Sequence, residues 1–390
     1  MDDQISAWQA LLRLLATAWD PEGVPPPESI PWPDIACLAA SSNVGALLHI
    51  VTRDMGDSIP PESRLALQNM YYHTAAANTL CMHQLAQVRA ALSAVGTPVL
   101  LLKGAALVEA LYENLAVRLI GDIDLAVPPQ NVPACRSVLI ELGYVPAAVE
   151  QRTGMYLAYH NEEAFLPPAP FQAPVELHWH LLDVPYYLRK VPMDWFWQNS
   201  EPYSVAGQPF QVLNLEACLV YLPAHLALHH QFHGLHSFLD LALLILHNRE
   251  RIDWERVIAT ARDFELLTAL RETLDRLAGL WPTLPSGVPH QKLHSVKPHP
   301  ADERLFRLLT TDPRSPTLDF YSDLVCLPDL PARTRFVLLN LFPQPAYMVE
   351  RYGIRARWHL PYWYLHRFGD GLVKFARTLR RARRLNQIRQ

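Results

Sequence analysis

The sequence predicts an α+β fold in which a small mixed-sheet domain is flanked by N-terminal and C-terminal helical regions. Two observations predict it. Apolar residues recur at helical spacing in both outer parts of the chain, whereas short apolar strands that alternate with amphipathic helices occur in the middle. We expect a helical subdomain at 1–94, an α/β domain at 95–210, and a helical region with a basic tail at 211–390.

Composition narrows the class of protein. Half of the 390 residues are hydrophobic and 18% are charged, which is typical of a packed globular chain. The net charge of -4 argues against a general nucleic-acid binder. Five scattered cysteines without a CxxC spacing indicate reduced thiols, and no signal peptide or transmembrane-length apolar run is present. We therefore expect a soluble cytoplasmic protein without a transmembrane segment.

The sequence predicts that the N-terminal region is helical. Residues 5–18 and 65–92 carry apolar side chains at helical spacing, and the Pro-rich segment DPEGVPPPESIPWPD connects them.

The pattern changes at Val95. VLLLKG is a short apolar run closed by Gly104, GDIDLAV is a second strand, and PVELHWHL is a third with strict alternation. The segments AALVEALYENL and NVPACRSVLIELGY between them have helical periodicity. This order predicts a small mixed sheet.

From about residue 211 the chain again reads as successive helices, with a Pro-rich break at 282–300. The last residues, GLVKFARTLRRARRLNQIRQ, are strongly basic. Such a run is usually a solvated helix face, and its other interpretation is a contact with an anionic partner such as RNA, a membrane surface or an acidic protein.

The second strand carries two carboxylates one residue apart. In an extended strand Asp122 and Asp124 share one face while Ile123 and Leu125 share the other, so we expect both carboxylates side by side on an exposed face. Two such carboxylates repel each other unless a cation lies between them. The pair is therefore either a solvated strand end or a site for a cation such as Mg²⁺, which prefers oxygen ligands.

The third strand repeats this arrangement. Glu176, His178 and His180 alternate with apolar residues, so Glu176 would supply a third carboxylate if this strand lies beside the second. Three carboxylates on neighbouring strands suit two-metal phosphoryl transfer.

The first strand supplies a candidate phosphate site. Lys103 and Gly104 lie at a strand-to-helix turn, where free backbone N–H groups favour a phosphate. Arg118 precedes the acidic strand and would reach a triphosphate. With the residues around them, the predicted nucleotide side comprises Lys103, Gly104, Ala105, Arg118 and Gly121.

The runs VLLLKGAAL, VRLIGDIDLAV and VELHWHL together resemble the DNA polymerase β-type nucleotidyltransferase superfamily, and more closely its bacterial group of uncharacterised nucleotidyltransferases. The resemblance implies transfer of an NMP group from an NTP, with ATP favoured, to an unidentified hydroxyl or phosphate acceptor. It implies Mg²⁺ as cofactor, with Mn²⁺ as the alternative. It also implies that Asp122, Asp124 and Glu176 are both the catalytic residues and the metal ligands.

One departure favours a different function. The superfamily usually has Gly-Ser at the turn, closely followed by the two aspartates, whereas this chain has Gly104-Ala105 eighteen positions before Asp122. The alternative is a catalytically degenerate nucleotide-binding or regulatory module on the same fold.

A row of histidines follows in the C-terminal region. His225, His229, His233, His236 and Asp240 recur at helical spacing, and we expect them on one helix face. They would bind a transition metal, line the cleft on the acceptor side, or form a polar packing seam. An HExxH signature is absent, which argues against a zinc hydrolase. The acceptor-side candidates are His178, His225, His229, His233 and Asp240.

Overall fold

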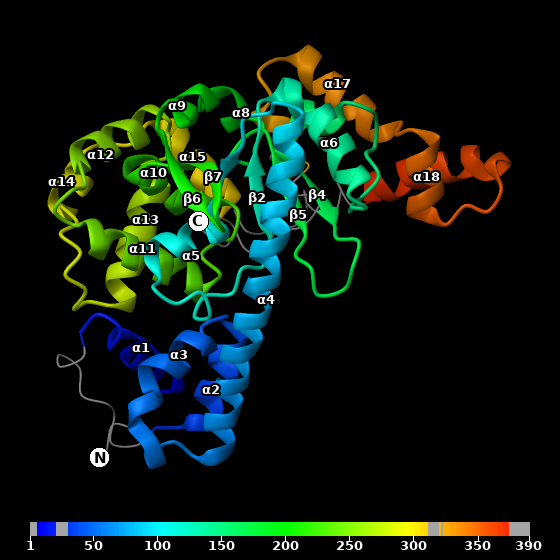
Figure 1. The fold of residues 1–390 in the computed structure, drawn as a ribbon. Helices are drawn as coiled ribbons and strands as arrows, with labels where there is room; N and C mark the ends of the chain where they lie inside the picture. Colours follow the sequence, from blue (N-terminus) through cyan, green and yellow to red (C-terminus); the bar gives the residue numbers. More distant parts are fainter. Residues whose placement is uncertain (1–5, 21–29, 311–319, 321–322, 374–390) are drawn as a thin grey trace.

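The computed structural model describes residues 6–20, 30–310, 320 and 323–373. Its architecture is α+β, as the sequence predicts: a seven-stranded mixed sheet is embedded in helices (Figure 1). None of the helices in the described part of the chain is both long enough and apolar enough to cross a membrane. The basic tail at 374–390, where an anionic partner was expected, lies outside the described residues.

The N-terminal helices form a bundle against the first half of one long helix. Figure 1 shows this helix, α4, continuing from the bundle along the sheet. Leu67 of α4 packs in the bundle core, whereas Leu85 and Leu92 of the same helix pack under the sheet. The elements are α1 (Ala7–Ala16), α2 (Trp32–Ser41), α3 (Gly45–Thr52), η1 (Arg53–Ser58) and α4 (Pro61–Ala94).

The sheet has the order β3-β4-β5-β2-β1-β7-β6. The pairs β2–β5 and β1–β7 are parallel, and the other neighbours are antiparallel. The strands are β1 (Leu100–Leu101), β2 (Ile123–Ala126), β3 (Val145–Pro146), β4 (Glu162–Leu166), β5 (Val175–His178), β6 (Ser200–Val205) and β7 (Gln208–Leu213). The last of these crosses the boundary expected at 210/211.

Helices between the strands cover the two faces of the sheet. The apolar faces of β2 and β5 pack against α4 and α6, through residues such as Leu125, Leu177 and Leu139. The opposite face of the sheet turns towards α5 and the C-terminal helices. The connecting helices are α5 (Lys103–Leu111), η2 (Pro129–Asn131), α6 (Val132–Glu141), α7 (Met155–Tyr159), α8 (Tyr187–Lys190) and α9 (Met193–Gln198).

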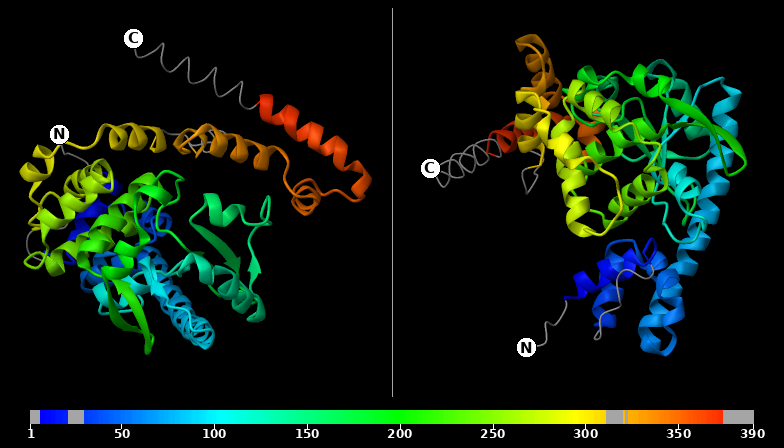
Figure 2. Two further views of the ribbon diagram at one scale, coloured as in Figure 1. Left: turned by 90° about the horizontal axis from the view of Figure 1, so that it is seen from above. Right: turned by 90° about the vertical axis from the view of Figure 1, so that its left-hand side faces the viewer.

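The C-terminal region contains a helical bundle and an arm. Figure 2 shows the chain after α15 passing along one side of the molecule, and Tyr159 of α7 packs there on Phe336 of α17. The helices are α10 (Leu215–Leu228), α11 (Leu235–Asn248), α12 (Trp254–Asp263), α13 (Leu267–Leu280), α14 (His290–Ser295), α15 (Pro300–Leu309), α17 (Leu330–Leu341), α18 (Pro345–Tyr352) and η3 (Arg357–His359).

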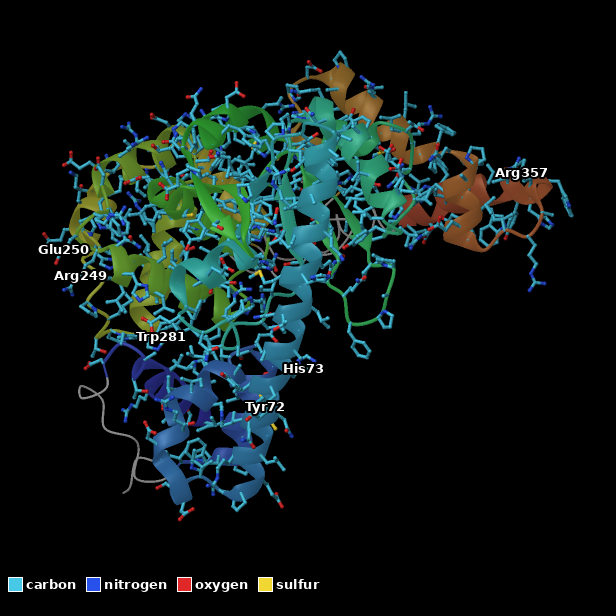
Figure 3. All side chains as sticks on the ribbon, in the orientation of Figure 1. Tyr72, His73, Arg249, Glu250, Trp281 and Arg357 are labelled. Carbon is cyan, nitrogen blue, oxygen red and sulfur yellow. The ribbon has the colours of Figure 1, made fainter. Side chains whose placement is uncertain are left out.

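The N-terminal bundle also packs against the C-terminal bundle. Trp281, which follows α13 and is labelled in Figure 3, donates its indole N–H to the carbonyl of Leu12 at 3.0 Å. Its ring meets the ring of Trp19 edge to face, with 5.3 Å between centroids. Residues of both bundles belong to one continuous core.

Candidate active site

The strands β2 and β5 place two carboxylates side by side. They pair in parallel with Asp124 opposite Glu176, so both side chains leave the same face of the sheet. Ile123 and Leu125 point to the other face and are fully buried there. Ligand atoms of Asp124, Glu176 and His178 all lie within 4.8 Å of one another. The alternation of polar and apolar residues in the sequence therefore matches the two faces of the sheet on which these side chains lie.

Asp124 is buried, which differs from the exposed face that the sequence suggests. Its side chain is fully buried and is neutralised from two directions. Lys103 Nζ lies 2.8 Å from Oδ1 and His178 Nε2 lies 2.9 Å from the same oxygen. Burial alone would raise the pKa of Asp124, but the charges of Lys103 and His178 hold it well below its usual range.

Asp122 lies just before β2 and is half-buried. Among the described residues, no side chain forms a hydrogen bond or ion pair with it. Burial, together with repulsion by Asp124 and Glu176, raises the pKa of Asp122 to about 6. Even with Lys103 and Arg118 nearby, the three carboxylates thus repel one another. A bound cation would relieve this repulsion.

The carboxylates fit a hard divalent cation. Asp124 Oδ2 is buried and has no hydrogen-bond partner in the described part of the chain, although a buried carboxylate oxygen normally has one. Asp122 and Glu176 line a cavity of about 220 Å³ beside it. All three offer oxygen, which Mg²⁺ prefers. The ammonium of Lys103 competes with such a cation for the space between Asp124 and Glu176, because its Nζ also lies 3.8 Å from Glu176 Oε2.

His178 contacts Asp124 and is not among the residues that line the cavity. It is 1% exposed, and its Nδ1 lies 3.0 Å from Glu162 Oε2 on the neighbouring strand β4. Burial would lower the pKa of His178, but Glu162 and the hydrogen bonds to Asp124 and Glu176 raise it to about 9. The imidazole is therefore a buried cation between carboxylates and is not among the residues that line the cavity, so its acceptor-side role stays a prediction.

The start of α5 forms the second wall of the cavity. Leu102, which precedes the helix, makes no side-chain hydrogen bond to the N–H groups of its first turn. Gly104 lines the cavity, and a Cβ on it would stand 2.5 Å from Arg118 Nη1. The helix N-terminus, Lys103 and Arg118 thus converge, as expected for an anion site. Gly121 also lines the cavity, whereas the side chain of Ala105 is buried in the core.

Arg118 forms an ion pair with Asp240, the acidic residue that follows the histidine row. Its Nη2 donates to Asp240 Oδ2 at 2.8 Å, and the hydroxyl of Tyr112 donates to Asp240 Oδ1 at 2.8 Å. Asp240 is 3% exposed and lines the cavity, and its contacts fix the guanidinium. Its acceptor-side role stays a prediction.

Asn78 is a buried positioning residue that the sequence analysis missed. From the middle of α4 its amide donates to the carbonyls of Leu115 and Arg118, at 2.6 and 2.7 Å, and accepts from Ile120 N at 2.8 Å. It therefore fixes the loop that presents Arg118. The sequence signal is a polar side chain close to the apolar stripe of the helix expected over 65–92.

The histidines do not share one helix face. α10 ends at Leu228 and α11 begins at Leu235, because Gln231, Phe232 and Gly234 adopt positive φ angles of 50°, 63° and 110°. The prediction of a single face was wrong for this reason. His233 is exposed and outside the cavity lining.

His225 and His229 do line the cavity, together with His230 and His236. His225 Nε2 lies 3.1 Å from His230 Nε2, and the ring of His225 stacks on that of His229 at 4.8 Å. Burial, followed by the charge of Lys103, lowers the pKa of His225 well below its usual range and that of His230 to about 4. Neutral imidazoles therefore face the carboxylates across the cavity. His230 was not expected there.

Among the comparisons with known proteins, a family model supports the resemblance to uncharacterised nucleotidyltransferases. A crystal structure of an antigenic nucleotidyltransferase-like protein from Paracoccidioides brasiliensis is similar at 15% identity and a TM-score of 0.32, covering 58% of this chain and 96% of that one. No curated protein matches the chain. The family model described as uncharacterised nucleotidyltransferase matches residues 28–282. Because this match spans more than half of the sequence and includes every residue of the cavity, the chain belongs to the family of uncharacterised nucleotidyltransferases.

Proposed function

We propose that the protein is a metal-dependent nucleotidyltransferase that moves an NMP group from an NTP to a hydroxyl or phosphate acceptor. One observation carries the proposal. Asp124 has a buried oxygen without a hydrogen-bond partner among the described residues and stands in register with Glu176. Glu176 and Asp122 line a cavity whose other wall is the N-terminus of α5. A carboxylate cluster opposite an anion site suits a nucleotide with its cation.

Each wall of the cavity has a role in this proposal. Asp122, Asp124 and Glu176 hold Mg²⁺, which when bound activates the attacking oxygen and neutralises charge on the leaving pyrophosphate. The free N–H groups near Gly104 bind the triphosphate, and Arg118 is already oriented towards it by Asp240. His225 and His230 share one hydrogen bond, so as neutral imidazoles they leave one ring nitrogen that accepts a hydrogen bond from a hydroxyl acceptor.

Several finer assignments belong to the same proposal. We infer ATP as the NTP, Mn²⁺ as a substitute for Mg²⁺, and a place in the bacterial group of the DNA polymerase β-type superfamily. We infer a cytoplasmic location because the five cysteines are free thiols. The anionic partner of the basic tail is also a proposal, which the composition of residues 374–390 supports.

Replacing Asp122 is the sharpest test. It bears negative charge in the cavity but makes no hydrogen bond, so Asp122→Asn should preserve the fold. We expect Mg²⁺-dependent NTP turnover to fall by at least about 10²-fold, as for loss of a group that stabilises transition-state charge. Product analysis with labelled NTPs measures this effect. The matched control is Asp57→Asn, whose side chain is fully exposed.

A variant that turned over NTP as fast as the wild type would refute the role of Asp122. Asp124→Asn is a weaker test, because it leaves Lys103 and His178 buried without their shared anion and is expected to destabilise the protein.

A second candidate function is a non-catalytic nucleotide-binding module. Lys103 favours it, because its ammonium already neutralises Asp124 and approaches Glu176. Calorimetry with NTP and Mg²⁺ separates the two functions when combined with product analysis. Metal-dependent binding with turnover supports the enzyme, and binding that is independent of Mg²⁺ and of Asp122 supports the module.

A further inference from the structure

A second cluster of metal-ligating side chains lies in the C-terminal bundle, away from the cavity. Asp275 projects from α13, and His290 and His294 project from one face of α14. His290 Nδ1 lies 3.3 Å from Asp275 Oδ1, and His294 Nε2 lies 3.0 Å from the same oxygen. All three ligand atoms lie within 4.8 Å of one another.

The distances match the coordination of a borderline transition ion. Zinc binds His nitrogen at about 2.0–2.1 Å and carboxylate oxygen at about 2.0–2.2 Å, so ligand atoms on a tetrahedral ion stand about 3.3 Å apart. The two distances to Asp275 Oδ1 are close to that edge. Two histidines four residues apart on a helix are a chelating pair, and imidazole selects Zn²⁺ over Mg²⁺.

The helices that carry the three ligands are fixed relative to each other. Leu293, between the two histidines, is fully buried, and its carbonyl accepts a hydrogen bond from Arg271 of α13 at 2.8 Å. Lys292 also pairs with Glu255 of α12. The cluster therefore exists before any ion arrives, which reduces the entropy lost on binding.

The ligands remain accessible. The side chains of Asp275, His290 and His294 are 39%, 38% and 50% exposed, so an ion can enter and keep a water in its fourth position. The two histidines also lie beyond the segment 28–282 that the family model matches.

We propose that Asp275, His290 and His294 form a Zn²⁺-class site that links α14 to α13. It is separate from the carboxylate cavity and does not depend on nucleotidyl transfer. The ion would staple the Pro-rich connection at 281–289 by joining its two ends, since Asp275 precedes this connection and His290 directly follows it.

The test is a titration of the chelator-treated full-length chain with Zn²⁺ alone, in a phosphine reductant. We expect one ion per chain with micromolar or tighter affinity, and at least about tenfold weaker binding in His294→Ala and in Asp275→Asn. Co²⁺ titrated into the wild type should give the visible absorption of a four-coordinate site. Mg²⁺ should bind none of the three ligands.

Two controls locate the ion. His73→Ala removes an exposed histidine of α4, labelled in Figure 3, and should leave the titration unchanged. Asp122→Asn should also leave it unchanged, which keeps this result independent of the proposed active site. Without metal, His294→Ala should unfold at the wild-type temperature because its side chain is half exposed. Zinc binding that is absent in the wild type, unaffected by His294→Ala, or lost in His230→Ala instead would overturn the proposal.

Discussion

The two candidate functions, a metal-dependent enzyme and a non-catalytic nucleotide-binding module, assign different roles to Lys103. Its Nζ is bound to Asp124 Oδ1 and so stands where a cation between Asp124 and Glu176 would stand. The other oxygen of Asp124 has no hydrogen-bond partner among the residues that the structure describes, so a metal and the ammonium can share this carboxylate. Ala105 bears less on activity than the sequence implies, because its side chain points into the core rather than the cavity.

A second buried carboxylate, Asp302 of α15, gives a pH prediction. It accepts from Thr268 N in the first turn of α13 at 3.0 Å, while its other oxygen has no hydrogen-bond partner within the described ranges. Burial raises the pKa of Asp302 to about 6 from 3.8, although hydrogen bonds from Thr268 oppose the shift. The folded protein therefore binds more protons between pH 4 and 6, and the free energy of unfolding falls as pH rises through this window.

Asp302→Asn removes this titration and keeps an acceptor for Thr268. Relative to the wild type, the variant should gain about 2 kcal/mol in free energy of unfolding between pH 4 and pH 6.5. Urea unfolding at several pH values measures the difference, with the exposed neighbour changed in Glu303→Gln as control. A difference between variant and wild type that stays constant with pH would contradict the raised pKa.

At the scale of elements, the sequence predicted the central strands and their faces because β2 and β5 alternate cleanly. It missed β3, β4, β6 and β7. The hairpin of β6 and β7 carries Pro202 and Pro209, which weaken a strand signal. Pro202 is tolerated because β6 is at the sheet edge, and Pro209 because it precedes the part of β7 that pairs with β1. It also treated the histidine row as continuous, since helical spacing does not report the positive φ angles near Gly234.

Within the candidate site, too, the sequence predicted what local patterns encode and missed contacts between distant residues. The three carboxylates follow from local alternation, so they were found. The pairing of Lys103 with Asp124 and the clamp by Asn78 join residues 21 to 42 positions apart, and no local pattern records such contacts.

The Asn78 clamp predicts a coupled loss of stability and nucleotide binding. Asn78→Ala removes two donated hydrogen bonds and one accepted one, and leaves their backbone partners buried. We expect a loss of about 2–4 kcal/mol in free energy of unfolding and weaker NTP binding, because the loop carrying Arg118 loosens. Denaturant unfolding and calorimetry measure the two effects. Thr79→Ala is the matched control, since its hydroxyl bonds only within α4. Unchanged NTP binding in a folded Asn78→Ala protein would contradict the positioning role.

At the scale of the whole molecule, the two helical bundles share one core although about 200 residues separate them in sequence. The division at 1–94, 95–210 and 211–390 therefore describes the order of the chain better than independent folding units, and it stays a prediction. The sequence could not reveal the shared core, since amphipathic periodicity shows that a helix is buried but not which partner covers it.

Trp281→Ala tests this shared core. The indole is 3% exposed, contacts Trp19 and donates to Leu12. Its removal should cost about 3–5 kcal/mol in free energy of unfolding. It should also make the N-terminal bundle more accessible to protease. Trp358→Ala, at a side chain that is 76% exposed, is the control and should change neither. Equal protease resistance of the two variants would show that the bundles do not depend on each other.

The helix α4 has a mechanical consequence for whatever binds the N-terminal bundle. At 34 residues it is a rod of about 51 Å, and Asn78 lies near its midpoint. A helix transmits rotation along its axis because its backbone is hydrogen-bonded throughout. A partner that turned or shifted the N-terminal end of this helix would therefore move the guanidinium of Arg118 near Gly104. Binding at the N-terminal bundle can in this way change the geometry of the candidate active site.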